Sequence, residues 1–311
     1  MAVWLPLYYP LMAVAVPPIA RIIAQPLHIL AQNCDLIHNV RIGREGLTYA
    51  SLQVARQRNI PFILTPVHHP RWVGWRYQVY LQLYREADAV IALTQTEKHT
   101  LMSLGVKPEQ IYVTGIGPVL APQADSQAFR DRHQLRGSVV LFLGQHYAYK
   151  GYHQLLQATT QVWEKYPETQ FVFIGPAVKQ SDQVFQSHQD PRIHRLGTVS
   201  LQEKTDALAA CDMLCVPSMQ ESFGGVFTEA WSFGKPVIGG NIPAVAEVVS
   251  DGKDGFLVAQ EPKTIATAII DLLNNPQKAS EMGKAGYEKV HQSYTWPKLA
   301  QKTLEIYQLL L

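Results

Sequence analysis

Two glutamates, Glu221 and Glu229, have the residue type and spacing in this chain that best suit them for chemistry. They stand on either side of a Ser-Phe-Gly-Gly turn, which follows the apolar run 213–216 and leads into a predicted helix. A strand, a glycine-rich turn and a helix together offer backbone N–H groups and a positive helix end to an anion. Because a carboxylate repels an anion, the two glutamates are better suited to accepting hydrogen bonds from hydroxyls on either side of it. A diphosphate flanked by a ribose and a hexose would have this layout.

The turn belongs to a longer alternation of short apolar runs and helical patterns, which must position the two glutamates. Thr94 and Glu97 form a capping-box pattern that opens one predicted helix, and Gly105 would close it. Alternating strands and helices predict parallel sheets covered by helices on both faces. The predicted strands begin at residues 35, 61, 89, 110, 139, 171, 213, 236 and 255.

The phrase from Glu221 to Val258 resembles the retaining glycosyltransferases of family 4, whose signature is an E-x7-E block. The resemblance extends from about Asp35 to the C-terminus and implies an α/β GT-B fold, with two Rossmann-like domains facing a cleft. It implies an acceptor-side domain over residues 1–122, a nucleotide-sugar domain over 123–292, and a C-terminal helix over 293–311 that crosses back to the first domain. The polar segment 121–137 is interpreted as an interdomain linker.

The resemblance also implies roles for the residues of the turn. Glu221 is similar to the glutamate that contacts the transferred sugar, and Glu229 to the one that accepts hydrogen bonds from the ribose. Glu229 is placed at the start of the helix, where a structural role opposite the helix dipole is the alternative. The amides of the residues between them would lie near the diphosphate and hexose: Ser222, Phe223, Gly224 and Gly225.

A second loop, LFLGQHYAYKG, resembles the family's cationic clamp on the diphosphate. Gly144 and Lys150 match that pattern, whereas Gln145 stands where the family has an arginine and carries no charge. His146, if protonated, is a candidate substitute for the missing cation, with an exposed histidine of no special role as the alternative. Gly175 would line the nucleotide side. A solvated surface position is the other interpretation of Lys150.

In the first half, FILTPVHHPRW resembles the strand end that carries the family's sugar-pocket histidine. We expect His68 or His69 to contact the donor hexose or the acceptor, the alternative being a turn without a role. The family's glycine-rich loop would precede Asp35, but residues 1–34 contain no glycine, so the resemblance implies an incomplete N-terminal domain.

Composition narrows the class of partner. The formal net charge of +2 over 311 residues argues against a nucleic-acid binder. Residues 1–20 contain no charged side chain, but their prolines, among them Pro17 and Pro18, favour a strand, a loop and a helix over a membrane span. We therefore expect a cytoplasmic protein, with peripheral association at the inner face of a membrane left open. Cys211 and Cys215 are interpreted as small core residues.

Taken together, these resemblances imply a retaining hexosyltransferase that moves a sugar from a nucleotide-diphosphate donor to the hydroxyl of a sugar or glycolipid acceptor. No Asp-x-Asp pattern is present, and the family mechanism predicts no metal and no cofactor besides the donor. The alternative is a catalytically impaired paralogue that binds a nucleotide or serves as a partner subunit of another transferase. Gln145 and the missing loop favour that alternative.

Overall fold

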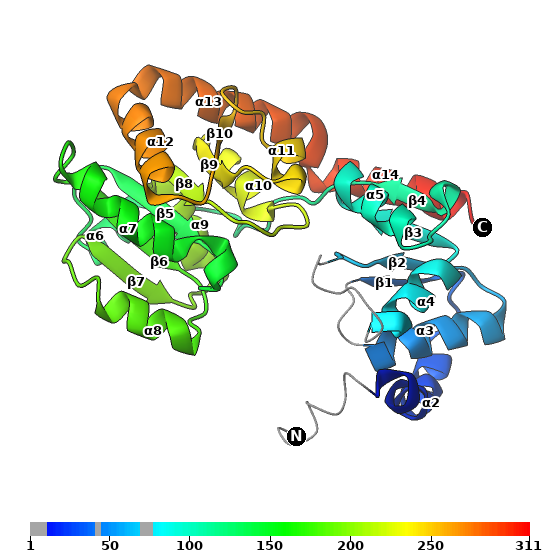
Figure 1. Cartoon of the computed structure of the whole chain (residues 1–311). Coiled ribbons are helices and arrows are strands. Elements are labelled where there is room, and N and C mark those ends of the chain that lie inside the picture. The colour runs from blue at the N-terminus through cyan, green and yellow to red at the C-terminus, as the bar shows by residue number, and fades with distance from the viewer. Residues whose placement is uncertain (1–10, 41–44, 69–76) are drawn as a thin grey trace. The chain divides into compact units, whose positions relative to one another are not determined.

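The computed structural model describes residues 11–40, 45–68 and 77–311, which form two compact units (Figure 1). One unit comprises Met1–Gly115 together with Leu299–Leu311, and the other comprises Ile116–Lys298. The chain therefore changes units after Gly115 and again after Lys298, compared with the expected changes after residues 122 and 292. Each unit is an α/β layer structure with its own parallel sheet.

The first unit contains a four-stranded parallel sheet in the order β1-β2-β3-β4. Every residue of the two central strands is buried, as expected where both faces of a parallel sheet are covered. The strands are β1 (Ile37–Val40), β2 (Phe62–Thr65), β3 (Ala89–Ala92) and β4 (Ile111–Val113), and the connecting helices are α3 (Glu45–Arg58), α4 (Gln78–Glu86), α5 (Gln95–Ser103) and η2 (Pro108–Gln110).

The C-terminal helix α14 (Trp296–Gln308) covers one face of this sheet. Ile306 is buried among Ile63 and Ile91 of the central strands. The hydroxyl of Tyr307 lies 2.6 Å from Nδ1 of His38 on β1. The last turns of the chain therefore belong to the core of the first unit, although they follow the second unit in sequence.

Helix α2 (Met12–Leu30) corrects the expectation that prolines would break the N-terminal segment into a strand, a loop and a helix. Pro17 and Pro18 lie inside the continuous helix, whereas Pro6 and Pro10 lie outside the described residues. Tertiary packing overrides the local cost: Val16 and Ala20 are fully buried, and α2 packs against α3. Of the helices in the described ranges, α2 alone has the length and apolar composition to cross a membrane, properties that core helices and signal sequences share.

The second unit contains a six-stranded parallel sheet in the order β10-β9-β8-β5-β6-β7. The strands are β5 (Val139–Leu143), β6 (Gln170–Ile174), β7 (Ile193–Gly197), β8 (Met213–Val216), β9 (Val237–Gly240) and β10 (Gly255–Val258). The helices are α6 (Ser126–Arg132), α7 (Tyr152–Trp163), α8 (Lys179–Gln186), α9 (Leu201–Ala210), α10 (Gly225–Trp231), α11 (Pro243–Val248), α12 (Pro262–Asn274) and α13 (Pro276–Lys289), with the short turns η3 (Ala148–Lys150) and η4 (Val290–Tyr294).

The order of these strands reverses between β5 and β8. From β5 the chain builds outward through β6 to β7, then returns through α9 to the other side of β5 and builds outward again through β9 to β10. In a doubly wound sheet, ligands bind outside the carboxyl ends of the strands at such a switch point. The loops that follow Leu143 and Val216 are therefore the place to look for a site.

The segment 121–137 is not a linker, contrary to expectation. It carries α6, which packs against α9 in the second unit. Phe129 is buried, and Arg130 donates hydrogen bonds to the carbonyl of Ala210 and to the carboxylate of Asp212. The polar composition suggested a linker, but the polar side chains are used to fasten the segment to its neighbours.

The two central cysteines are core residues, as predicted. Cys211, which caps the C-terminal end of α9, and Cys215, which lies in β8, are both fully buried. Burial raises the pKa of Cys211 to about 12, which keeps its thiol protonated at neutral pH.

Candidate active site

Lys150 and Glu221 meet at the point where the strand order reverses. Lys150 ends the η3 turn after β5, and Glu221 lies in the loop after β8. The Lys150 Nζ lies 2.5 Å from Oε1 of Glu221, and the Ser218 hydroxyl donates to the same oxygen at 2.8 Å. Two residues that sequence places 71 positions apart therefore form one ion pair, at the edge where parallel sheets of this kind bind ligands.

The turn that follows Glu221 is shaped by glycine. Gly224 has a φ of 83° and serves as the N-cap of α10, and a Cβ there would come within 2.5 Å of the Phe227 ring. Only glycine combines this backbone conformation with that close approach. Phe223 is buried, with its ring at right angles to that of Tyr294, so its side chain anchors the turn. Ser222 is half-buried, and Gly225 begins α10.

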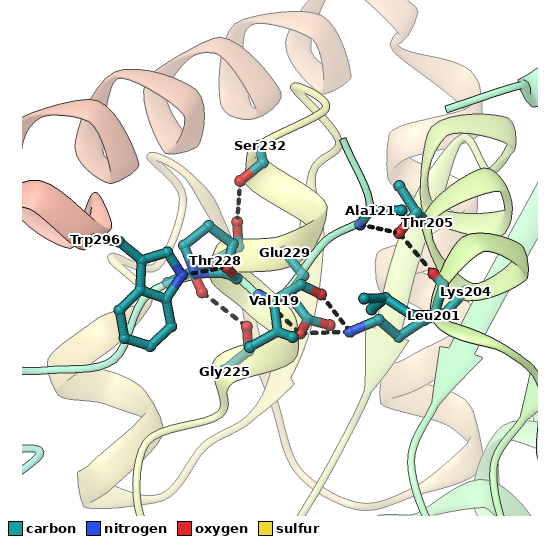
Figure 2. Close-up of polar contacts among 11 residues, drawn as sticks. Val119, Ala121, Leu201, Lys204, Thr205, Gly225, Thr228, Glu229, Ser232 and Trp296 are labelled. Atoms are coloured by element: carbon teal, nitrogen blue, oxygen red, sulfur yellow. Dashed lines mark hydrogen bonds and ion pairs between the residues drawn. The ribbon is translucent and has the colours of Figure 1, made fainter. Parts of the chain in front are cut away.

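Glu229 lies in the second turn of α10, and not at its start as expected. Its side chain is buried, with 7% of the residue exposed. Oε1 accepts a hydrogen bond of 2.7 Å from Lys204 Nζ on α9, and lies 3.4 Å from the backbone N–H of Val119 (Figure 2). A position in the second turn removes the alternative that Glu229 only complements the dipole at the helix start, because that effect falls off within the first turn.

Within the described residues, only one of the two carboxylate oxygens of Glu229 has hydrogen-bond partners. Burial raises the pKa of Glu229, and the nearby Lys204 ammonium and the Val119 amide oppose that rise. Its second oxygen, Oε2, is buried and has no hydrogen-bond partner among the described residues. An unpaired buried acceptor is costly and rare in native proteins, so it points to a donor group that a ligand would supply.

The two glycines that follow β5 and β6, Gly144 and Gly175, pack backbone against backbone. A Cβ on Gly175, whose φ is 143°, would lie 2.0 Å from the carbonyl oxygen of Gly144. Gly144 in turn donates its N–H to Ile174. Gly175 therefore has a structural reason to be glycine, apart from any contact with a nucleotide. Gln145, which follows Gly144, is exposed and places an uncharged amide beside the end of β5.

His146 is neither exposed nor a substitute cation, contrary to both expectations. It is fully buried, against the rings of Tyr152 and Phe185, and neither ring nitrogen has a partner among the described residues. Burial, with Arg195 acting in the same direction, lowers the pKa of His146 to about 4. The imidazole is therefore neutral at physiological pH, and it packs as a core side chain.

His68 belongs to the first unit, where it follows β2 and is buried. Its Nδ1 lies 3.1 Å from the hydroxyl of Tyr84, and its backbone N–H donates to Oε1 of Glu97. The other oxygen of Glu97 accepts the N–H of Leu93, so this carboxylate joins the ends of two strands. Val67 has a φ of 50°, a strained conformation for a β-branched residue. His69, the other predicted histidine, lies outside the described residues.

Sequence reasoning missed one residue in each unit: Lys204, which pairs with Glu229, and Glu97, which accepts the N–H of His68. Lys204 lies in α9, 25 positions before Glu229, and no local pattern links the two. Glu97 was predicted only as part of a helix cap, and Thr94 does accept the Glu97 N–H. Within the described ranges, no group of three or more His, Cys, Asp or Glu side chains is arranged to hold a metal ion.

Two Rossmann-like units, each with a parallel sheet of its own, are the architecture of the GT-B fold class. The family model "Glycosyl transferases group 1" matches residues 125–289, and the chain belongs to that family. The Anabaena protein HepE in complex with UDP-glucose has the same fold, with a TM-score of 0.80, 21% identity, and coverage of 92% of this chain and 82% of HepE.

Curated relatives match with lower coverage of their own length. Spore coat protein SA of Bacillus subtilis is 27% identical over 208 residues, which are 60% of this chain and 55% of that protein. The MMP alpha-(1->4)-mannosyltransferase of Mycolicibacterium hassiacum is 23% identical over 301 residues, 88% of this chain and 70% of the enzyme. The chain thus spans between about half and 70% of the length of these relatives.

Proposed function

We propose that this chain is a retaining hexosyltransferase, which moves a sugar from a nucleotide-diphosphate donor to an acceptor hydroxyl. The observation that carries the proposal is the buried Glu229 carboxylate, with one oxygen unpaired in a unit of the glycosyl transferase group 1 family. The unpaired oxygen would accept from the ribose, while Lys150 and Glu221 lie at the ligand-binding edge of the same sheet.

In this mechanism Lys150 stabilises the negative charge that develops on the departing diphosphate. Glu221 orients the transferred hexose, and the amides of Ser222 to Gly225 line the diphosphate side. His68 or His69 would contact the hexose or acceptor. The chain supplies no protein nucleophile in this proposal, so catalysis comes from charge stabilisation and from positioning of the two substrates. No metal and no further cofactor take part. HepE, whose structure is in complex with UDP-glucose, is the precedent for a nucleotide-sugar ligand.

The test combines nucleotide binding with turnover. Calorimetry with UDP, GDP and ADP should reveal one preferred base, and the corresponding sugar donor should be hydrolysed slowly without an acceptor. Glu229→Ala or Lys150→Ala should lower turnover by roughly 100-fold or more, since each removes a contact to the charged donor. Lys278→Ala is the matched control, because Lys278 forms a 2.7 Å ion pair with Asp271 elsewhere in the unit. Unchanged turnover in both site variants would refute the assignment.

A second candidate function is a catalytically impaired paralogue or partner subunit that binds a nucleotide. The observation that favours it is the uncharged pair that follows Gly144: Gln145 is an amide, and His146 is buried and neutral. The diphosphate would then meet Lys150 without a second cation from this loop. Tight nucleotide binding with no donor hydrolysis and no transfer, over a panel of UDP-, GDP- and ADP-sugars, would select this candidate.

We also propose a cytoplasmic protein that acts in polysaccharide or glycolipid synthesis, peripherally associated with the inner face of a membrane. Support for the membrane contact comes from α2, whose outer face exposes Val14, Ile22 and Ile29. An amphipathic helix with such a face can lie in the interface of a bilayer. Ile22→Glu with Ile29→Glu should abolish co-sedimentation with anionic vesicles and leave thermal stability unchanged. Sedimentation equal to wild type would exclude the contact.

A further inference from the structure

Within the described residues, the Glu229 carboxylate makes hydrogen bonds through one oxygen only. Oε1 faces both the Lys204 ammonium at 2.7 Å and the Val119 N–H at 3.4 Å, whereas Oε2 is buried without a partner in the described part of the chain. A carboxylate can accept about four hydrogen bonds. The protein thus fills one half of its capacity and leaves the other half to a ligand.

Lys204 is itself fixed on two sides. Besides Glu229, its ammonium donates to the carbonyl of Val119 at 2.7 Å (Figure 2). The next two residues of α9 hold the same segment: the hydroxyl of Thr205 accepts the N–H of Ala121, and the carboxylate of Asp206 accepts the N–H of Asp125. These bonds strap the segment after Val119 to α9, so Lys204 reaches Glu229 from a rigid support.

We propose that Lys204 is a positioning residue of the donor site, which orients Glu229 so that Oε2 alone receives the ribose hydroxyls of a nucleoside diphosphate. This inference rests on the proposed function. Removal of Lys204 would free the carboxylate to rotate and would leave it buried without a countercharge. The site would then lose its ability to distinguish a ribose from a 2′-deoxyribose, because discrimination depends on a fixed acceptor that goes unpaired when a hydroxyl is missing.

The pH dependence of nucleotide binding distinguishes a positioning role of Lys204 from a merely structural one. Among the described residues, Lys204 is the one charged group that contributes to the pKa shift of Glu229, and Val119 contributes its backbone amide. Lys204 opposes the rise that burial causes, so its loss would raise the pKa of Glu229 further. Nucleotide binding to Lys204→Met should therefore weaken as the pH falls, starting from a higher pH than in the wild type.

The experiment measures the Kd of UDP, GDP and ADP, and of their 2′-deoxy analogues, by calorimetry between pH 5.5 and 8.5. For the preferred base we expect Lys204→Met to weaken ribonucleotide binding about tenfold and to bring the ribose-to-deoxyribose ratio close to one. Lys204→Arg should restore most of both, because it keeps the charge and the donors. Lys289→Met is the matched control, since Lys289 forms an ion pair with the fully buried Asp254 in the same unit.

Each outcome decides between the inference and its premise. Wild-type protein that binds none of the three diphosphates would overturn the proposed function and the inference together. Wild-type discrimination that survives in Lys204→Met, or that Lys289→Met removes equally, would overturn the inference alone. Should Lys204→Met not fold, Lys204→Gln and the pH profile of Lys204→Arg take its place, and unaltered discrimination in Lys204→Gln would overturn the inference.

Discussion

Lys150 and Glu221 neutralise each other across the switch point of the second sheet, where the ammonium lies 2.5 Å from the carboxylate. Both side chains are largely buried, at 19% and 11% exposed, so this pair is stronger than one on an open surface. In the proposed function a diphosphate would take the place of Glu221 as a partner of Lys150. Binding of a diphosphate would therefore require Lys150 to change partners.

That competition gives the first prediction. Glu221→Gln should strengthen binding of UDP alone by about threefold, because Lys150 loses the carboxylate that competes with phosphate. The same variant should lower sugar transfer by roughly 100-fold, because an uncharged amide holds the hexose hydroxyls less strongly than a carboxylate does. Calorimetry and turnover assays on one preparation check both. Weaker binding of UDP by Glu221→Gln would show that the pair assists the nucleotide and does not compete with it.

The second prediction concerns Glu97 and pH. Burial raises the pKa of Glu97 to about 7 from 4.5, against the opposing hydrogen bonds from Leu93 and His68. The folded state therefore holds a proton that the unfolded state releases, and stability contributed by this group is present below about pH 4.5 and lost as the pH rises through about 7. The change is on the order of 1–3 kcal/mol.

Urea unfolding at pH 5 and at pH 8 tests this linkage. Glu97→Gln lowers stability at both pH values, because an amide cannot accept from both N–H groups, but it should flatten the difference between them. Asp88→Asn, at an exposed ion pair with Arg56, controls for removal of a carboxylate in the same unit. An equal pH dependence in Glu97→Gln and wild type would contradict the prediction.

The third prediction concerns His146. Its two ring nitrogens are buried without partners, and its pKa is lowered to about 4, so protonation opposes folding. Stability contributed by the neutral ring is full above pH 6.5 and falls as the pH drops towards 4. His146→Phe should raise the free energy of unfolding by about 1 kcal/mol at pH 7, since no polar atom is left unpaired, and by more at pH 5. Denaturant titration at both pH values measures the gain, and a loss at pH 5 would show that the ring cluster cannot take the larger side chain.

The fourth prediction compares two glycines with positive φ. Gly175→Ala should destabilise the second unit by about 3 kcal/mol, because its Cβ would lie 2.0 Å from the Gly144 carbonyl. Gly197→Ala should cost only about 1 kcal/mol, because its φ of 68° is strained for alanine but nothing lies within 4 Å of the added atom. Thermal unfolding of both variants separates the steric term from the backbone term. Equal costs would mean that Gly144 moves away freely.

Sequence periodicity located all but one of the strands within the described residues, because residues buried on both faces of a parallel sheet form continuous apolar runs. The exception is β7 (Ile193–Gly197), the edge strand, whose residues are only half-buried and whose His and Arg interrupt the pattern. The error at α2 has a similar origin, since proline propensity is local, whereas the helix is held by packing of Val16 and Ala20.

By itself, the sequence determined the family, the alternation of strands and helices, and the glutamates most worth examining, since these depend on residue type and short spacing. Only the tertiary structure decided which side chains of the site contact one another. In the structure, Lys150 forms an ion pair with Glu221, and Lys204 forms one with Glu229. His146 is buried, and Glu97 accepts the backbone N–H of His68. The physical reason is that pairings across strand crossovers depend on sheet order and burial, which bring distant segments together and which no local pattern encodes.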